Sequence, residues 1–156
     1  MKYSSASAFR RALEDRLRQQ GLQSGVPLVR LRKMIAFDRF LARLVQVQPN
    51  QWVVKGGFAL QLRLGQRART TKDIDLLMLD QQQDVYFRLS AVGATVLDDW
   101  FSFEVSRIAL SATENFGGDQ YQVLSLLDGR RFEGFHLDVG VGDHCYFCCV
   151  ANASCT

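Results

Sequence analysis

The sequence predicts an α+β protein in which two N-terminal helices pack against a mixed β-sheet. Apolar residues recur at helical spacing through residues 6–47. Short β-rich runs bounded by glycine and polar residues follow in residues 52–143. The elements succeed one another as helix, helix, strand, helix, strand, helix and then further strands. This order is typical of an α+β fold with a mixed sheet, and 156 residues suit a single domain.

The first expected helix covers residues 6–20. Ser5 or Ser7 can cap its N-terminus, and Gly21 is a natural stop. The apolar positions that recur at roughly helical spacing are Ala8, Leu13 and Leu17.

A second, longer helix is expected from Pro27, which fits the first helical position, to about Val47. Pro49 and Asn50 break it. Its apolar stripe consists of Leu28, Leu31, Ile35, Leu41 and Leu44.

The first part of the expected sheet contains two strands separated by a short helix. Residues 52–55 form a β-rich run that ends at a Gly-Gly pair, and residues 73–79 form the second strand. Between them lie a short helix over residues 58–64, which Gly65 can end, and a basic loop over residues 66–72.

The second part is expected to contain a helix and three strands. The helix is predicted over residues 83–89, and the strands over residues 101–110, 121–127 and 132–139. Asp128 and Gly129 give a turn signal after the second of these strands.

Composition indicates a globular protein of the cytoplasm. Apolar residues make up 47% and charged residues 22% of the chain. No apolar run approaches the roughly 18 to 20 residues needed to cross a bilayer. The N-terminal residues lack the apolar segment of a secretory signal. We therefore expect no membrane partner.

Charge is distributed unevenly along the chain. Residues 1–50 carry ten Lys and Arg against three acidic residues, whereas the remainder is net acidic, and the total is +3. A basic helical segment beside an acidic half suits a polyanionic partner such as RNA. The alternative is an ordinary solvated basic helix face.

Two aspartates at the start of one strand are the strongest functional signal. In a strand, Asp73 and Asp75 point to the same face, about 7 Å apart at Cα. Asp is depleted in strands, and like charges on one face repel each other unless a cation lies between them. Carboxylates that hold divalent metal ions are a usual device for phosphoryl chemistry. The pair therefore predicts a metal-dependent nucleotidyltransferase.

A Gly-Gly pair precedes the aspartates and could hold phosphate. Gly56 and Gly57 leave the backbone open at the start of a helix, where N–H groups and the helix dipole favour an anion. Asp138, in a later strand with His136 on the same face, is the expected third carboxylate. The alternative is that Asp138 lies on a solvated strand face.

Basic and hydroxyl side chains lead into the aspartate strand. Arg69, Thr71 and Lys72 precede Asp73, and Arg can hold phosphate oxygens in a bidentate manner. Lys55 is a further candidate for phosphate contact. The alternative for each is a role in surface solubility.

Taken together, these motifs resemble the signature of the AbiEii/AbiGii toxin family, within the DNA-polymerase-β-like nucleotidyltransferase superfamily. The matching segments are Lys55-Gly56-Gly57-Phe58-Ala59-Leu60, Arg69-x-Thr71-x-Asp73-Ile74-Asp75-Leu76 and Phe135-His136-Leu137-Asp138-Val139-Gly140. The resemblance covers approximately residues 6–143 and implies a nucleotidyltransferase-like sheet.

The resemblance implies a bacterial toxin–antitoxin or phage-defence (abortive infection) toxin with a separately encoded antitoxin. It also implies nucleotide transfer from an NTP to an acceptor, with tRNA expected. Asp73, Asp75 and Asp138 would bind Mg²⁺ or Mn²⁺, and Asp138 would activate the attacking hydroxyl. Lys55, Gly56, Gly57, Arg69 and Thr71 would form the nucleotide site.

The end of the chain departs from the family pattern. We expect a nucleotidyltransferase domain over residues 1–143, with helices over 6–47 and a catalytic sheet over 52–143. Residues 144–156 form a Cys-rich tail, interpreted as non-native, where the family carries a C-terminal helical region. Crowded cysteine spacing makes a zinc site a minor alternative. With that helical region absent, weak or no activity is expected.

Two other functions fit the sequence. The same fold could serve a small-molecule nucleotidyltransferase of the aminoglycoside-modifying kind, which the basic N-terminal segment disfavours. An inactive truncated remnant could act only as a binding module. NTP and RNA binding would distinguish these hypotheses.

Overall fold

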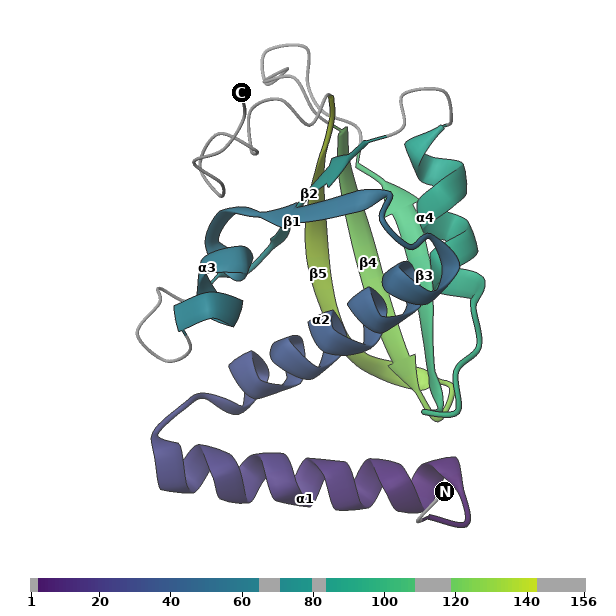
Figure 1. The fold of residues 1–156 in the computed structure, drawn as a ribbon. Coiled ribbons are helices and arrows are strands. Elements are labelled where there is room, and N and C mark those ends of the chain that lie inside the picture. Colours follow the sequence, from purple (N-terminus) through teal and green to yellow (C-terminus); the bar gives the residue numbers. More distant parts are fainter. Residues whose placement is uncertain (1–2, 65–70, 80–83, 109–118, 143–156) are drawn as a thin grey trace.

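A computed structural model describes residues 3–64, 71–79, 84–108 and 119–142, and it confirms the α+β fold (Figure 1). Its elements follow the predicted order. They are α1 (Ala6–Ser24), α2 (Leu28–Val47), β1 (Trp52–Lys55), α3 (Gly56–Leu64), β2 (Ile74–Met78), α4 (Val85–Ala94), β3 (Phe101–Arg107), β4 (Asp119–Leu127) and β5 (Arg130–Val141).

The five strands form one mixed sheet in the order β1-β2-β5-β4-β3. Strands β2 and β5 are parallel, and the other three neighbouring pairs are antiparallel. Strands β4 and β5 form a hairpin whose turn residues, Asp128 and Gly129, have φ values of 57° and 66°. Positive φ at both central residues is the requirement of a type I′ turn, which explains the accuracy of this turn prediction.

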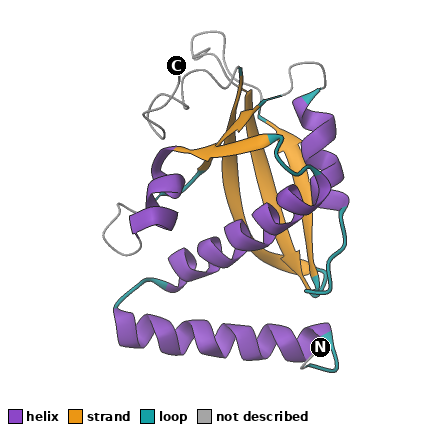
Figure 2. Cartoon of the chain, in the orientation of Figure 1, coloured by secondary structure: helices purple, strands orange, loops and turns teal. Residues whose placement is uncertain are grey.

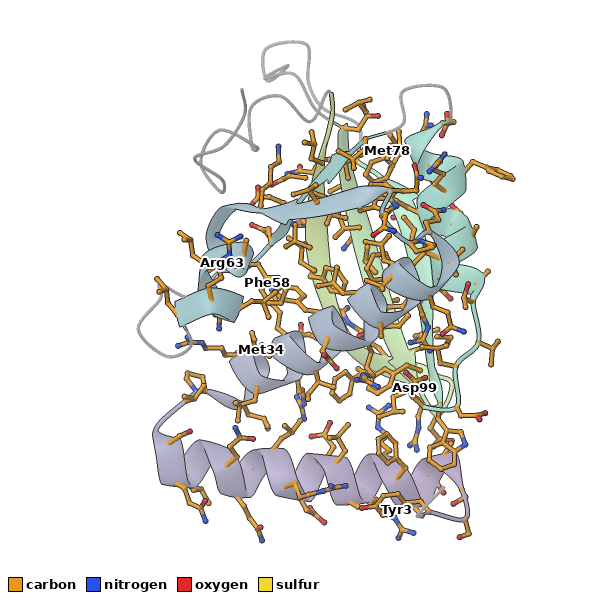
Figure 3. All side chains as sticks on the ribbon, viewed as in Figure 1. Tyr3, Met34, Phe58, Arg63, Met78 and Asp99 are labelled. Carbon is orange, nitrogen blue, oxygen red and sulfur yellow. The ribbon has the colours of Figure 1, made fainter. Side chains whose placement is uncertain are left out.

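Helices α2, α3 and α4 pack on the face of the sheet that carries the buried strand residues (Figure 2). Phe37 of α2 packs edge-on against Phe58 of α3 and Phe135 of β5, with ring centroids 5.0 and 4.9 Å apart. Phe58 therefore lies between α3 and the rest of the core (Figure 3). Strand residues on the opposite face, such as Asp75 and Asp138, are partly exposed.

The predicted end of the first helix at Gly21 is wrong. Helix α1 continues to Ser24, and Gly25 ends it with a φ of 69° and an amide that donates to the Gly21 carbonyl. A Cβ on Gly21 would lie 3.0 Å from the carbonyl oxygen of Val26. Gly21 is thus required for close packing of the following turn, while Gly25 takes the left-handed conformation that ends the helix.

Several other boundaries differ from the sequence prediction. Pro27 is the N-cap of α2 instead of its first residue, α3 begins at Gly56 instead of residue 58, and β5 spans Arg130–Val141 instead of residues 132–139.

The fourth helix, expected over residues 83–89, spans Val85–Ala94, because the Asp84 carboxylate caps it by accepting from the Phe87 amide. Strand β4 begins at Asp119, two residues before the expected start. Residues 65–70, 109–110 and 143–156, which include Gly65, most of the basic loop and the Cys-rich tail, lie outside the described residues.

No helix in the described part of the chain is long and apolar enough to span a membrane.

A buried arginine joins α2 to the connection between α4 and β3. The Arg43 side chain is fully buried and donates two hydrogen bonds to the Asp99 carboxylate, at 2.9 and 2.6 Å. It also donates to the carbonyls of Thr95 and Phe101 and lies over the Phe103 ring. One buried side chain therefore joins α2 to the segment before β3, and its guanidinium has hydrogen-bond partners there.

We predict that Arg43→Met lowers the free energy of unfolding by about 3 to 5 kcal/mol, because it leaves the Asp99 carboxylate, which is only 12% exposed, without its main partner. Denaturant unfolding measures this change. The matched control is Arg18→Met, which removes an exposed ion pair with Asp15 and should cost about 1 kcal/mol or less. Equal losses in the two variants would contradict the structural role of Arg43.

Candidate active site

A row of polar side chains crosses the sheet on the face opposite the helices. In the strand register, Lys55 of β1 is opposite Asp75 of β2, and Asp75 is opposite Asp138 of β5. Asp138 is in turn opposite Gln120 of β4. Neighbouring strands lie about 4.8 Å apart, so four side chains from four strands form one continuous polar row.

The two central carboxylates of this row repel each other. Burial is the main cause that raises the pKa of Asp75 above its ordinary value of 3.8, and the neighbouring Asp138 and Asp73 carboxylates raise it further. The Lys55 ammonium acts in the opposite direction. Negative charge is therefore concentrated where β2 and β5 meet, which favours a bound cation.

Lys55 extends across the sheet toward β5. Its Nζ atom lies 3.2 Å from the position that a Cβ would take on Gly140, two residues after Asp138. Because Gly140 has no side chain, the ammonium can lie on the same face as the two carboxylates. Gly140 was part of the motif recognised in the sequence, but its role as space for Lys55 depends on the parallel register.

The Gly-Gly pair contacts the aspartate strand directly. Gly56 has a φ of 64°, and a Cβ on it would lie 1.9 Å from Oδ2 of Asp75. A Cβ on Gly57 would lie 3.3 Å from the Cβ of Thr71, whose hydroxyl donates to the Asp73 carbonyl at 2.9 Å. The start of α3, Asp75 and the segment leading into β2 are thus packed against one another.

Asp73 is held differently from the other two carboxylates. Its Oδ1 atom lies 3.5 Å from Nδ1 of His136, and both side chains are partly exposed. Within the described residues, no group of three or more His, Cys, Asp or Glu side chains is arranged to hold a metal ion. The structure therefore pairs Asp75 with Asp138 and places Asp73 beside His136 at the edge of this pair.

Gln120 is a site residue that sequence reasoning missed. Its side-chain amide donates to Oδ1 of Asp138 at 2.7 Å, which fixes one carboxylate oxygen and leaves the other available. The residue stood outside the strand predicted over residues 121–127, so its face could not be assigned. Of the predicted nucleotide contacts, Lys55, Gly56, Gly57 and Thr71 are described together here, whereas Arg69 lies outside the described residues.

This fold, with paired carboxylates beside a Gly-Gly turn, is that of a nucleotidyltransferase. Among solved structures, the chain is similar to the nucleotidyltransferase toxin MenT4 of Mycobacterium tuberculosis H37Rv, with a TM-score of 0.57 and 20% sequence identity. The match covers 81% of this chain and 43% of MenT4, so the chain spans less than half the length of that toxin. No curated protein sequence matched.

Residues 39–147 match the family model described as "Nucleotidyl transferase AbiEii toxin, Type IV TA system". This match covers more than half of the chain, which therefore belongs to that family. The sequence-based family assignment is confirmed, and the matched region includes the whole polar row across the sheet.

We predict that Gly56→Ala disrupts the site, because the added methyl group would collide with the Asp75 carboxylate in addition to straining the backbone. Gly25→Ala is the matched control, since Gly25 has a similar φ of 69° and open space around it. Denaturant unfolding should show a cost of roughly 1 to 2 kcal/mol for Gly25→Ala, from the left-handed backbone alone. A larger loss for Gly56→Ala is expected, and equal losses would contradict the close contact with Asp75.

We predict that Asp75→Asn raises the melting temperature at neutral pH. Because the pKa of Asp75 is raised in the fold, the folded state binds its proton more tightly than the unfolded chain, and ionisation destabilises the fold. The gain should shrink as the pH falls through the raised pKa and vanish below the ordinary value of 3.8.

Thermal unfolding across this pH range measures the effect. Asp15→Asn is the control, because Asp15 pairs with Arg18 at the surface and no gain is expected from it. A lower melting temperature for Asp75→Asn than for the parent protein at neutral pH would contradict the raised pKa of Asp75, which burial and the neighbouring Asp138 carboxylate cause.

Proposed function

We propose that this protein is a metal-dependent nucleotidyltransferase that transfers a nucleotide from an NTP to an RNA acceptor. The observation that carries the proposal is the placement of Asp75 opposite Asp138, directly beside the start of α3. Nucleotidyl transfer requires a cradle for the triphosphate, acidic metal ligands and an oriented hydroxyl. The described residues supply candidates for each requirement.

The carboxylates fit a divalent cation in their chemistry and their electrostatics. Carboxylate oxygens are the donors that Mg²⁺ and Mn²⁺ prefer. Burial and then the neighbouring carboxylates raise the pKa of Asp75, and a bound cation would relieve the repulsion between these carboxylates. Asp75 and Asp138 would be the central ligands, and Asp73 would join them by turning away from His136. The bound metal would neutralise phosphate charge and favour ionisation of the attacking hydroxyl.

The start of α3 fits the triphosphate. The first turn of this nine-residue helix contains no acidic side chain, and glycines at both of its first positions leave its N–H groups accessible. Lys55 would add a positive charge on the same face as the carboxylates. Arg69 and Thr71 remain proposed nucleotide contacts, Thr71 because it packs against Gly57.

Asp138 fits the role of the group that orients the attacking hydroxyl. The Gln120 amide holds one of its oxygens, which leaves the second oxygen to accept a proton or to bind metal. The acceptor implied by the family resemblance is tRNA. The family description as a toxin of a type IV toxin–antitoxin system supports a cognate antitoxin as partner. The proposed role in abortive infection rests on the family resemblance.

The family match favours this function over small-molecule modification, because the matching model describes a toxin. The inactive-remnant hypothesis makes a different prediction, namely that the site no longer binds NTP. One binding experiment distinguishes it from an active enzyme.

We predict that the protein binds NTP in the presence of Mg²⁺ and that an Asp73→Ala, Asp75→Ala double variant loses this binding. The physical reason is that the carboxylates hold the cation that neutralises the triphosphate. Isothermal titration of each NTP, with and without Mg²⁺, measures the effect.

The control is an Asp15→Ala, Asp38→Ala double variant, which removes the same charge from two exposed carboxylates that pair with Arg18 and Arg39. It should bind NTP as the parent protein does. Absence of NTP binding by the parent protein would contradict the proposed function and support the remnant hypothesis. A subsequent assay for labelled nucleotide incorporation into tRNA tests the acceptor.

A further inference from the structure

A small pocket lies next to the candidate active site, with a mainly apolar wall to which three cationic residues contribute. It has a volume of about 240 Å³ and lies between the first half of α2 and the segment leading into β2. Met34 of α2, labelled in Figure 3, forms part of its wall. The pocket is lined by Val29, Arg30, Lys33, Met34, Thr71 and Lys72.

Three cationic side chains line this pocket, and within the described residues none of them has a carboxylate partner. Arg30 and Lys33 are half-buried and one helical turn apart, while Lys72 is exposed. Six other described arginines contact an acidic side chain. These paired residues are Arg18, Arg32, Arg39, Arg43, Arg107 and Arg130. Three like charges around one pocket repel one another, and an anion would relieve this repulsion.

The start of α2 adds positive potential to the same place. Pro27 caps this helix without a side-chain hydrogen bond, and its first turn contains no acidic residue. Val29 and Arg30 belong to that first turn and line the pocket. The partial positive charge of the helix terminus therefore acts in the same direction as the side-chain charges.

Thr71 connects the pocket to the active site. It lines the pocket, packs against Gly57 and donates a hydrogen bond to the Asp73 carbonyl. Among the described residues that line the pocket there is no glycine and no carboxylate. The pocket is thus a neighbour of the site that holds Gly56 and Asp75, and its own chemistry is different.

We propose that this pocket binds the phosphodiester backbone of the polynucleotide acceptor. Arg30, Lys33 and Lys72 contact a phosphate group, and the apolar side chains of Val29 and Met34 contact the adjoining sugar or base. A nucleotide unit within a chain matches this combination, because it joins a phosphate to an apolar ring surface. The inference rests on the proposed function and assigns the acceptor its own contact surface beside the NTP.

The test compares two double variants that each remove two positive charges. One is Arg30→Gln, Lys33→Gln in the pocket. The control is Arg11→Gln, Arg131→Gln, which removes two exposed cations that have no carboxylate partner among the described residues and do not line the pocket. Circular dichroism and thermal unfolding establish that both variants are folded.

Binding of a short fluorescein-labelled single-stranded RNA is measured by anisotropy over a range of salt concentrations. Loss of this phosphate contact should reduce the slope of log K against log salt by about 0.7, the contribution of one contact on a single strand. The control variant should keep the slope of the parent protein. Titration with NTP and Mg²⁺ on the same proteins should show no difference between the pocket variant and the control.

The outcomes separate this inference from the proposed function. If the pocket variant loses NTP binding and keeps its RNA slope, the pocket belongs to the triphosphate and the inference is wrong. If neither ligand is affected, or if the parent protein binds no RNA, the inference is also wrong. RNA binding that depends on the pocket in a protein that binds no NTP would overturn the proposed function and support the pocket.

Discussion

The candidate site depends on the parallel pairing of β2 with β5. In this register Asp75 is opposite Asp138, while Ile74, Leu76 and Leu137 are fully buried on the other face. Because side chains alternate along a strand, the register that buries the apolar residues beneath the helices also brings both carboxylates to the open face. A slip by one residue would exchange the two sets. Hydrophobic burial and the geometry of the site are therefore fixed by the same interaction.

The fold tolerates two neighbouring carboxylates, Asp75 and Asp138, where β2 pairs with β5. Burial and neighbouring carboxylates raise the pKa of Asp75, and Lys55 only partly offsets this effect. The arrangement is retained because the residues beneath it form an apolar core that includes Phe37, Phe58 and Phe135. Departures from local stability in an otherwise consistent fold are expected at functional sites. The repulsion is thus itself an argument that this part of the sheet binds a cation.

The sequence was sufficient for the class of fold and for most of the strands, because their patterns are local. The turn at Asp128 and Gly129 is such a local pattern, because Asp-Gly is a residue pair typical of a hairpin turn. The structural role of a glycine was ambiguous from the sequence alone. Gly21 allows close packing, whereas Gly25, four residues later, ends the helix. The contacts of Gln120 with Asp138, and the reach of Lys55 toward Gly140, depend on which strands are neighbours. That order arises from packing across the whole sheet, so no local pattern contains it.

Charge along the sequence and charge on the structure carry different information. The excess of positive charge in residues 1–50 suggested an extended basic face. Part of this positive charge is neutralised by ion pairs within the protein. Arg32 pairs with Glu14 and joins α1 to α2, and Arg43 pairs with Asp99. What remains near the candidate active site is the cluster of Arg30, Lys33 and Lys72, which Thr71 connects to Gly57 and Asp73. Separation of the two charges suits an enzyme with two anionic substrates. A cation between carboxylates can hold the triphosphate. A second polyanion would be repelled by those carboxylates, so its binding requires fixed positive side chains at a separate place.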